Sequence, residues 1–222
     1  MDSLFSINAD VVSNLQTKFD KVYCINLDKR TDRIEKFQAQ AISYDLGDYT
    51  RISAVDGTNL KINEYTNRLS PGELGLVLTN LEIIKNAKKN QYNNILILED
   101  DCVFTDEILK IEDYFSKLPT NWDMLYMGGN HNTHMGIQGP SKVNEKVVKL
   151  HTTYSTHFIG IKNTLFEHIE IILSKYQEPL DVSYVKLQKI FNVYSFYPAI
   201  TNQIVDFSDI QNKITDYRWL IK

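Results

Sequence analysis

Short apolar runs alternate with longer amphipathic segments along most of the chain, and this alternation constrains the fold more than any other feature. We expect buried strands in the runs that carry β-branched and aromatic residues: 21–27, 50–57, 94–98, 122–129, 147–151, 155–161 and 191–198. Helical spacing of apolar residues is found in the segments 28–40, 70–90, 107–118, 163–176 and 180–190. Such alternation predicts an α/β fold, with a mostly parallel central sheet flanked by helices.

The composition is that of one globular domain. The chain has 222 residues, of which 43% are hydrophobic and 23% are charged, so it can bury a core without disulfides. We expect a single domain over 1–222, with an N-terminal extension over about 1–20 and a C-terminal tail over about 200–222. A formal net charge of −4 argues against a protein that binds nucleic acid or coats an anionic membrane.

The cysteines and the lack of targeting signals favour a cytoplasmic protein, in the host cytoplasm if the chain is viral. Cys24 and Cys102 each lie in an apolar run, which predicts buried free thiols rather than a disulfide. The N-terminal segment MDSLFSINAD lacks the apolar block of a signal peptide. No stretch approaches the roughly 18 apolar residues of a membrane-spanning helix.

Helix starts are signalled at two places. Ser70 precedes Pro71, and Glu73 follows Ser70 at the spacing of a capping box. Asp28 or Thr31 is expected to cap the helix that follows the first strand.

Polar segments follow three of the expected strands directly, at 28–33, 99–101 and 128–134. Because ligands of parallel α/β sheets bind at the carboxyl ends of the strands, we expect these segments to meet in one site. The most informative segment is ILILEDD, in which four apolar residues lead straight into Glu99, Asp100 and Asp101.

Three adjacent carboxylates repel one another, and leaving them uncompensated beside a sheet is costly. A hard divalent cation, Mn²⁺ or Mg²⁺, would relieve the repulsion because it prefers oxygen ligands. If the backbone stays extended, Glu99 and Asp101 point to one side, where they can hold a metal that also binds a diphosphate, and Asp100 points to the other. The alternative is an acidic loop that faces water.

Several other α/β chemistries are excluded. The sequence contains neither Gly-x-x-x-x-Gly-Lys-Ser/Thr nor Gly-x-Gly-x-x-Gly, which excludes the P-loop and Rossmann dinucleotide classes. No Ser-His-Asp or Cys-His pattern is recognisable. A phosphotransfer protein that uses the acidic cluster stays open as an alternative.

A series of motifs, taken in order, resembles glycosyltransferase family 25, which includes bacterial lipooligosaccharide glycosyltransferases and procollagen galactosyltransferases. The motifs are VYCINLDKRTDRIEKF, RISAVDG, SPGELGLVLTN, ILILEDDCVF, WDMLYMGG, STHFIGIKNTLFEHI, PLDVSY and SDIQ. The resemblance implies a GT-A-like nucleotide-binding fold and metal-dependent transfer of glucose or galactose from a UDP-sugar to a hydroxyl group. By resemblance, the acceptor is hydroxylysine or galactosyl-hydroxylysine of a collagen-like protein, or else an oligosaccharide or lipooligosaccharide.

The resemblance also assigns roles to residues. Mn²⁺ or Mg²⁺ would be bound by Glu99 and Asp101, with Asp209 as a further ligand from the tail as it closes on the site. Arg30 and Arg33 would bind the diphosphate of the UDP-sugar, because a guanidinium suits a phosphate. The remaining residues assigned to the UDP-sugar are Asp28, Asp56, Gly57 and Asp100.

Two residues are assigned to catalysis. Asp181, in PLDVSY, would accept the proton of the acceptor hydroxyl, as a direct displacement requires, although it could instead only cap a helix. His157 stands in the Thr-His motif of the family, where a role at the substrate or the metal competes with a buried structural role.

The chain departs from the family pattern at two places. Thr79 and Asn80 stand where the family commonly has Ser-His, and Phe158-Ile159 follows His157 in place of a segment that carries tyrosine. The departure at Thr79 and Asn80 motivates a rival interpretation, a non-catalytic module that binds a nucleotide-sugar or glycan. A homodimer is a further expectation. Most aromatic residues are expected in the core, and an exposed Trp or Tyr at the mouth of the site would stack on a sugar.

Overall fold

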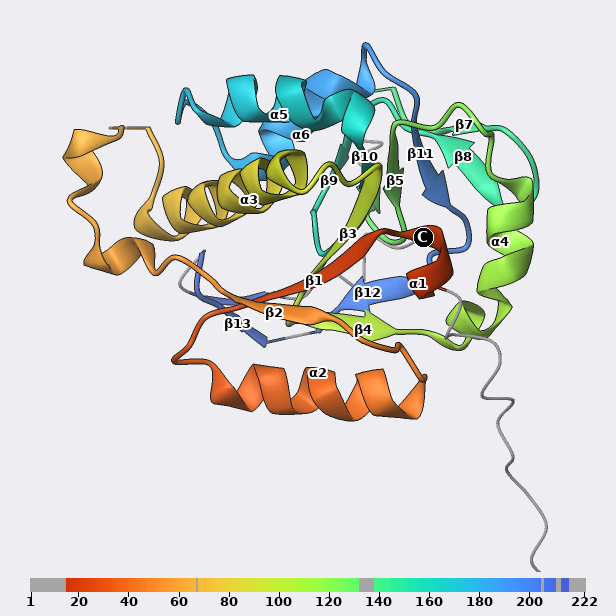
Figure 1. The fold of residues 1–222 in the computed structure, drawn as a ribbon, viewed down its shortest axis with the longest axis horizontal. Coiled ribbons are helices and arrows are strands. Elements are labelled where there is room, and N and C mark those ends of the chain that lie inside the picture. Colours follow the sequence, from red (N-terminus) through yellow and green to blue (C-terminus); the bar gives the residue numbers. More distant parts are fainter. Residues whose placement is uncertain (1–14, 67, 132–137, 205, 211–212, 216–222) are drawn as a thin grey trace, which may run out of the picture.

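An eight-stranded sheet forms the centre of the molecule. The computed structural model describes residues 15–66, 68–131, 138–204, 206–210 and 213–215. The strands of the sheet, in spatial order, are β2 (Thr50–Ser53), β1 (Lys21–Asn26), β3 (Asn94–Glu99), β10 (Phe158–Lys162), β5 (Met124–Tyr126), β11 (Val193–Phe196), β8 (Val147–Lys149) and β7 (Ser141–Lys142) (Figure 1).

The sheet is mixed in its pairing but largely uniform in direction. β1 pairs in parallel with both β2 and β3, and β5 pairs in parallel with β11. β10 and β8 are antiparallel to their neighbours, so the other six of the eight strands run the same way. This arrangement confirms the predicted α/β class with a mostly parallel central sheet.

Helices cover both faces of the sheet. Three pack on one face in Figure 1: α3 (Pro71–Lys89), α5 (Phe166–Leu173) and α6 (Leu180–Gln188). The other face is covered by α1 (Leu15–Lys18), α2 (Thr31–Ser43) and α4 (Ile111–Lys117).

Two hydrophobic clusters form the core, one on each face. Val22 and Cys24 of β1 pack toward α2, whereas Tyr23 and Ile25 pack toward α3. Neighbouring side chains of a strand point to opposite faces, so a fully apolar strand fills both clusters. This explains why the central strands are continuous apolar runs without an apolar–polar alternation.

Three small ladders lie outside the main sheet. They pair β4 (Cys102–Phe104) with β12 (Thr201–Gln203), β6 (Asn130–His131) with β9 (Thr153–Tyr154), and β13 (Asp206–Ser208) with β14 (Lys213–Thr215). Four 3₁₀ turns complete the elements of the described residues: η1 (Gly57–Asn59), η2 (Ile62–Glu64), η3 (Asp106–Lys110) and η4 (Asn163–Leu165). The helix expected over 107–118 is therefore divided into η3 and α4.

The predicted helix starts have opposite outcomes. Ser70 and Glu73 form the capping box, with Ser70 N donating to Glu73 Oε2 at 2.7 Å and Glu73 N donating to Ser70 Oγ at 3.3 Å. The predicted cap of α2 by Asp28 or Thr31 is wrong, because Arg30 occupies the N-cap position and makes no capping bond with its side chain. The Asp28 side chain instead forms hydrogen bonds with residues of β2, as described below.

Two expectations from composition concern the thiols and the membrane. Cys24 and Cys102 are buried and free, as predicted. Within the described residues, no helix combines the length and the apolar character needed to cross a membrane.

Candidate functional site

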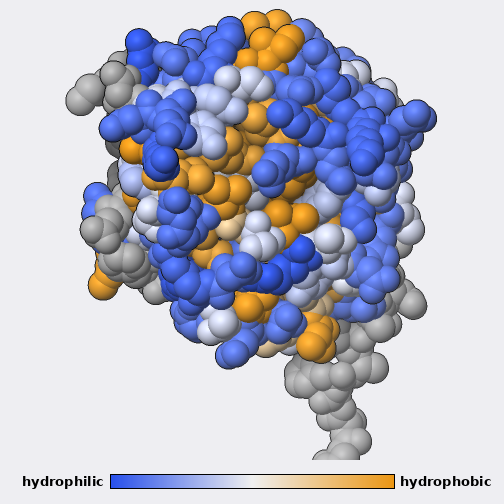
Figure 2. Space-filling view, turned by 60° about the vertical axis from the view of Figure 1, so that its left-hand side comes forward, coloured by the Kyte–Doolittle hydropathy of each residue, from blue (hydrophilic) through white to orange (hydrophobic). Residues whose placement is uncertain are grey.

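A cavity of about 450 Å³ opens at the carboxyl ends of β1, β2 and β3. Residues 25–27, 54–58 and 99–101, which end or follow these strands, line it. β10 runs the opposite way, so its amino end brings residues 154–156 to the same edge. Figure 2 turns this side forward and shows a hydrophobic band between hydrophilic rims. The three polar segments predicted to meet do so, apart from residues 132–137, which lie outside the described residues.

Three carboxylates stand on the cavity wall. Glu99 ends β3 and accepts a hydrogen bond from Thr156 Oγ1 at 2.7 Å. Asp100 and Asp101 form a turn between β3 and β4. The extended backbone assumed for the side-chain alternation therefore stops at Glu99, and all three carboxylates line the cavity.

Burial and mutual repulsion perturb this cluster. Burial, followed by the negative charge of Asp101, raises the pKa of Glu99 to about 8. The pKa of Asp101 is raised to about 6 by burial, against the lowering effect of Arg33. Burial also raises the pKa of Asp100, opposed by the hydrogen bond from Asn26 and by Arg33. Strong perturbation of grouped carboxylates in a cavity is typical of functional sites.

One of the carboxylates, Asp101, has an oxygen that the described residues do not use. Asp101 Oδ1 is buried and has no hydrogen-bond partner among the described residues, although the Asp101 side chain as a whole is 17% exposed. No group of three or more His, Cys, Asp or Glu residues in the described part of the chain is arranged to hold a metal. The donor set therefore fits a divalent cation only if Glu99 and Asp101 supply part of its shell and a ligand supplies the rest.

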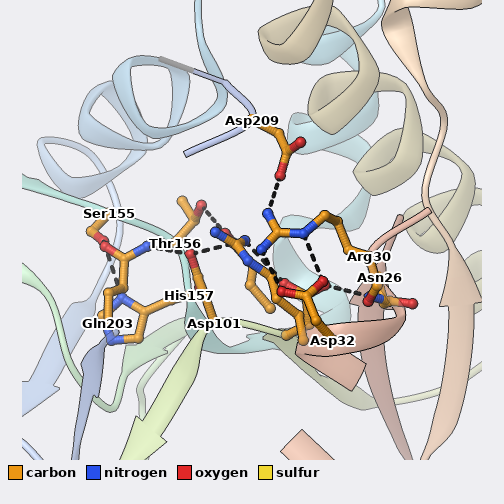
Figure 3. Close-up of polar contacts among 12 residues, drawn as sticks. Asn26, Arg30, Asp32, Asp101, Ser155, Thr156, His157, Gln203 and Asp209 are labelled. Carbon is orange, nitrogen blue, oxygen red and sulfur yellow. Dashed lines mark hydrogen bonds and ion pairs between the residues drawn. The ribbon is translucent and has the colours of Figure 1, made fainter. Parts of the chain in front are cut away.

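Arg30 and Arg33 flank the carboxylates and are mostly buried. Arg33 Nη1 lies 3.3 Å from Asp100 Oδ1 and 3.6 Å from Asp101 Oδ2. Arg30 donates to both carboxylate oxygens of Asp32, each at 2.9 Å, and to Asp209 Oδ2 at 2.6 Å (Figure 3). Asp209 thus pairs with Arg30 from the C-terminal tail. It does not join Glu99 and Asp101, as its predicted role as a metal ligand would require.

Asp28 lies outside the cavity wall. Its carboxylate accepts hydrogen bonds from Arg51 Nη2 and Ser53 Oγ, both at 2.6 Å, and these bonds lower its pKa, that of Ser53 most. The side chain is 69% exposed. Asp28 therefore fastens the end of β1 to β2, and in this arrangement it does not reach a ligand in the cavity.

Asp56 and Gly57 do line the cavity. Asp56 accepts from Lys29 Nζ at 2.8 Å and from Thr58, and these bonds lower its pKa to about 2. A Cβ on Gly57 would lie 1.7 Å from the carbonyl oxygen of Pro71, so only glycine lets this turn reach the start of α3. The bond of Lys29 to Asp56 and the close approach of Gly57 to Pro71 together position the turn.

The departure at Thr79 and Asn80 falls behind the cavity. Thr79 Oγ1 accepts from Val55 N at 2.9 Å and donates to the carbonyl of Gly75 at 2.7 Å, which anchors the turn to α3. Asn80 is 3% exposed and donates to the Leu76 carbonyl. Asn80 is not among the cavity-lining residues, so it cannot replace a histidine that acts on a ligand there.

His157 is buried beneath the wall and does not line the cavity. Ser155 Oγ donates to Gln203 Oε1 at 2.6 Å, so it accepts from His157 Nδ1 at 3.0 Å, which leaves Nε2 to accept from Thr201 Oγ1 at 3.3 Å. Burial lowers the pKa of His157 to about 4. Its predicted catalytic contact is not made, because burial removes the ring from the cavity. The ring instead positions Ser155 (Figure 3).

Asp181 lies in the first turn of α6 and lines the cavity. Its Oδ1 accepts from Val182 N at 2.8 Å. The N-cap position belongs to Pro179, so Asp181 is not the cap of this helix. Burial raises the pKa of Asp181 above its ordinary value.

Sequence reasoning missed other wall residues. Asn26 Nδ2 donates to Asp100 Oδ2 at 2.5 Å, Thr156 bonds Glu99, and Gln203 Nε2 lies 3.5 Å from Asp101 Oδ2. Asn130 and Tyr154 were missed as well. The available signals were the polar last residue of an apolar strand for Asn26 and the polar segment 128–134 for Asn130, and only tertiary structure brings in Gln203.

The fold and the site define the chain first as an α/β protein with a ligand cavity, lined by arginines and carboxylates, at the carboxyl edge of its sheet. The model of glycosyltransferase family 25 (LPS biosynthesis protein) matches residues 19–185, and the chain belongs to this family. This confirms the resemblance seen in the motifs, and the α/β sheet agrees with the GT-A-like arrangement expected for it.

Curated relatives carry collagen-related names. The chain is 24% identical to mouse procollagen galactosyltransferase 2 over 152 residues, which cover 60% of this chain and 24% of the relative. It is 26% identical over 159 residues to the procollagen lysyl hydroxylase and glycosyltransferase of Acanthamoeba polyphaga mimivirus, covering 60% of this chain and 17% of the relative. The chain thus spans a quarter or less of the length of these relatives.

Solved structures with a related arrangement were also found. One is a glycosyltransferase involved in the glycosylation of the major capsid of PBCV-1, with a TM-score of 0.41, 13% identity, and coverage of 71% of this chain and 67% of that one. Another is A197 from STIV, with a TM-score of 0.46, 13% identity, and coverage of 88% of this chain and 93% of that one.

Proposed function

We propose that the chain transfers a hexose, glucose or galactose, from a UDP-sugar to a hydroxyl acceptor. One observation carries the proposal: a single cavity wall joins the guanidinium groups of Arg30 and Arg33 to the carboxylates of Glu99 and Asp101. Guanidinium groups suit the phosphates of a nucleotide-sugar. The acceptor proposed is hydroxylysine or galactosyl-hydroxylysine of a collagen-like protein, in line with the relatives' names, and an oligosaccharide is the second choice.

Mn²⁺, or Mg²⁺, belongs to the proposal as the cofactor. Glu99 and Asp101 would hold it, and it would supply Lewis-acid stabilisation of the charge that develops on the leaving diphosphate. The buried Asp101 Oδ1, which has no hydrogen-bond partner among the described residues, supports this choice. Arg33 would orient the Asp100–Asp101 turn through its contacts with both carboxylates.

Asp181 is proposed as the general base for the acceptor hydroxyl. It lines the same cavity as the carboxylates and comes from α6, which follows the nucleotide-binding strands in sequence. Backbone hydrogen bonds, among them that of Val182 N to Oδ1, hold the carboxylate at the wall, and burial raises its pKa. A homodimer and a cytoplasmic location also stay proposals.

A screen for UDP release tests the proposal. The protein is incubated with Mn²⁺ and UDP-glucose or UDP-galactose, with and without a hydroxylysine-containing collagen peptide or an oligosaccharide. We expect release with one of the two sugars, increased by one of the acceptors. Binding of the UDP-sugars without any release would support the non-catalytic module, and phosphoryl incorporation without UDP release would support phosphotransfer.

A further inference from the structure

Asn130 and Tyr154 face each other across the β6–β9 ladder, and both line the cavity. Residues directly opposite in an antiparallel ladder project from the same face, with Cβ atoms about 4.5–5.5 Å apart. The ladder therefore places an amide and a phenol ring side by side on the cavity wall. Neither residue has a role in the chemistry described above.

The Asn130 amide is not fully used by the fold. Its Oδ1 is buried and has no hydrogen-bond partner among the described residues. A buried acceptor without a partner is costly, so a ligand that satisfies this amide is favoured. A half-turn about χ2 exchanges the carbonyl oxygen with the NH₂ group, so the side chain can offer either one to a ligand.

Tyr154, by contrast, is held in place from both sides. Before it, Thr153 N donates to Gln188 Oε1 at 2.8 Å and the Thr153 carbonyl accepts from Gln188 Nε2 at 2.7 Å. After it, Ser155 is bound by His157 and Gln203. An element fixed in this way presents its side chains in a defined geometry, which binding sites require.

The approach of the two strands depends on Gly129. A Cβ at this position would lie 2.8 Å from Thr153 Cγ2 and 3.3 Å from the ring of Tyr126. Glycine therefore allows β6 to reach β9 and brings Asn130 to the wall. The neighbouring Gly128 is restricted as well, because its Cβ would lie 2.2 Å from the Thr201 carbonyl oxygen.

Contacts of the segment that carries Tyr154 link the pair to the carboxylate cluster and to α6. Two residues after Tyr154, Thr156 donates to Glu99. The helix that carries Asp181 also carries Gln188, which holds β9. A group bound at Asn130 and Tyr154 would therefore share one cavity with the carboxylate cluster and with Asp181.

We propose that Asn130 and Tyr154 form the subsite for the hexose of the UDP-sugar, in which Tyr154 stacks on a sugar face and Asn130 hydrogen-bonds a sugar hydroxyl. Aromatic rings with a polar end suit such amphipathic ligands. The inference rests on the proposed function, because the transferred hexose is attached to the diphosphate that the carboxylates and arginines would bind.

Calorimetric titrations with UDP, UDP-glucose and UDP-galactose, in the presence of Mn²⁺, test the subsite. Asn130→Ala and Tyr154→Leu should weaken binding of the UDP-hexose by about three- to tenfold and leave UDP binding unchanged. Tyr154→Phe keeps the ring and should bind the UDP-hexose like the wild type. Asn144→Ala is the matched control, because Asn144 bonds Lys117 and Lys146 outside the cavity.

Unchanged UDP binding shows that each variant has a folded site. The inference is overturned if Asn130→Ala and Tyr154→Leu bind the UDP-hexose like the wild type. It is likewise overturned if they weaken the binding of UDP as much as the binding of the UDP-hexose. It is also overturned if only the Michaelis constant of the acceptor rises. A wild-type protein that binds neither UDP nor a UDP-hexose would overturn the proposed function itself, and the inference with it.

Discussion

Negative charge exceeds positive charge among the side chains of the carboxylate cluster. Arg33 contacts Asp100 and Asp101, whereas Glu99 accepts a hydrogen bond from the uncharged hydroxyl of Thr156. Arg30, the nearby second cation, is already paired with Asp32 and Asp209. The described residues therefore do not fully compensate the negative charge of Glu99 and Asp101, and protonation or a bound cation would reduce their repulsion.

Asp181→Asn tests the proposed base at the scale of one atom. The change keeps the shape of the side chain and its acceptor for Val182 N but removes its capacity to take a proton. We expect turnover to fall by about 10²–10⁴-fold with little change in affinity for the UDP-sugar. Steady-state kinetics of UDP release measure both quantities. Wild-type values of both would show that Asp181 only supports the start of α6.

His157→Gln tests the structural role of the buried histidine through pH. Because burial lowers its pKa to about 4 in the folded state, the ring stays neutral there, while an unfolded chain binds the proton below its ordinary value of 6.5. Stability is therefore present above pH 6.5 and is lost as pH falls toward 4, by up to about 3 kcal/mol. Glutamine does not titrate and should remove this part of the pH dependence.

Urea unfolding of the wild type and His157→Gln at pH 7.0, 5.5 and 4.5 gives the comparison. The difference in stability between the two proteins should shift toward the variant as pH falls. Other titrating groups are common to both proteins and cancel in the difference. Parallel pH curves would show that the pKa of His157 is not lowered in the folded protein, and would contradict the prediction.

At the scale of elements, the backbones of the turn 55–57 and of the start of α3 approach so closely that there is no space for a side chain at Gly57 or Gly75. A Cβ on Gly75 would lie 2.3 Å from the Val55 carbonyl oxygen, and one on Gly57 would lie 1.7 Å from that of Pro71. Thr79 adds a hydrogen bond to Val55 N. The turn is thereby fixed at the cavity wall, where Asp56 is presented.

Gly57→Ala should therefore separate the turn from α3. We expect a loss of stability of about 1–3 kcal/mol, since the backbone must move to admit a methyl group. Binding of UDP should weaken too, because residues 54–58 line the cavity. Asn59→Ala, in the same 3₁₀ turn but exposed, is the control and should leave both measurements unchanged. Normal stability of Gly57→Ala would contradict the packing described.

The elements that the sequence predicts well are those whose apolar pattern is long. The helix α3 and its capping box, and the central strands β1 and β3, follow from local spacing and burial. The ladders β4–β12 and β6–β9 do not, because their strands have two or three residues and pair across long stretches of chain. Strands this short carry no readable period.

At the scale of the whole molecule, the cavity collects residues from nearly the full length of the described chain. The places of Glu99 and Asp101 after β3, and of Arg33 in the first turn of α2 after β1, follow from the rule for parallel sheets. Gln203 arrives from the C-terminal tail, which has no clear apolar period, and Asp209, which the SDIQ motif did predict at the site, pairs with Arg30. The burial of His157 and the exposure of Asp28 were likewise decided by tertiary contacts that no local spacing encodes.

The Mn²⁺ dependence of UDP binding tests the central claim most directly. Calorimetric titration of UDP, with and without Mn²⁺, is carried out on the wild type and on Asp101→Asn. We expect Mn²⁺ to strengthen binding by the wild type more than about tenfold and to have little effect on the variant. The variant should be at least as stable as the wild type without metal, because a repulsive charge is removed. Equal Mn²⁺ dependence in the two proteins, or none in the wild type, would contradict the assignment of Glu99 and Asp101 as the metal-binding pair of a UDP-sugar transferase.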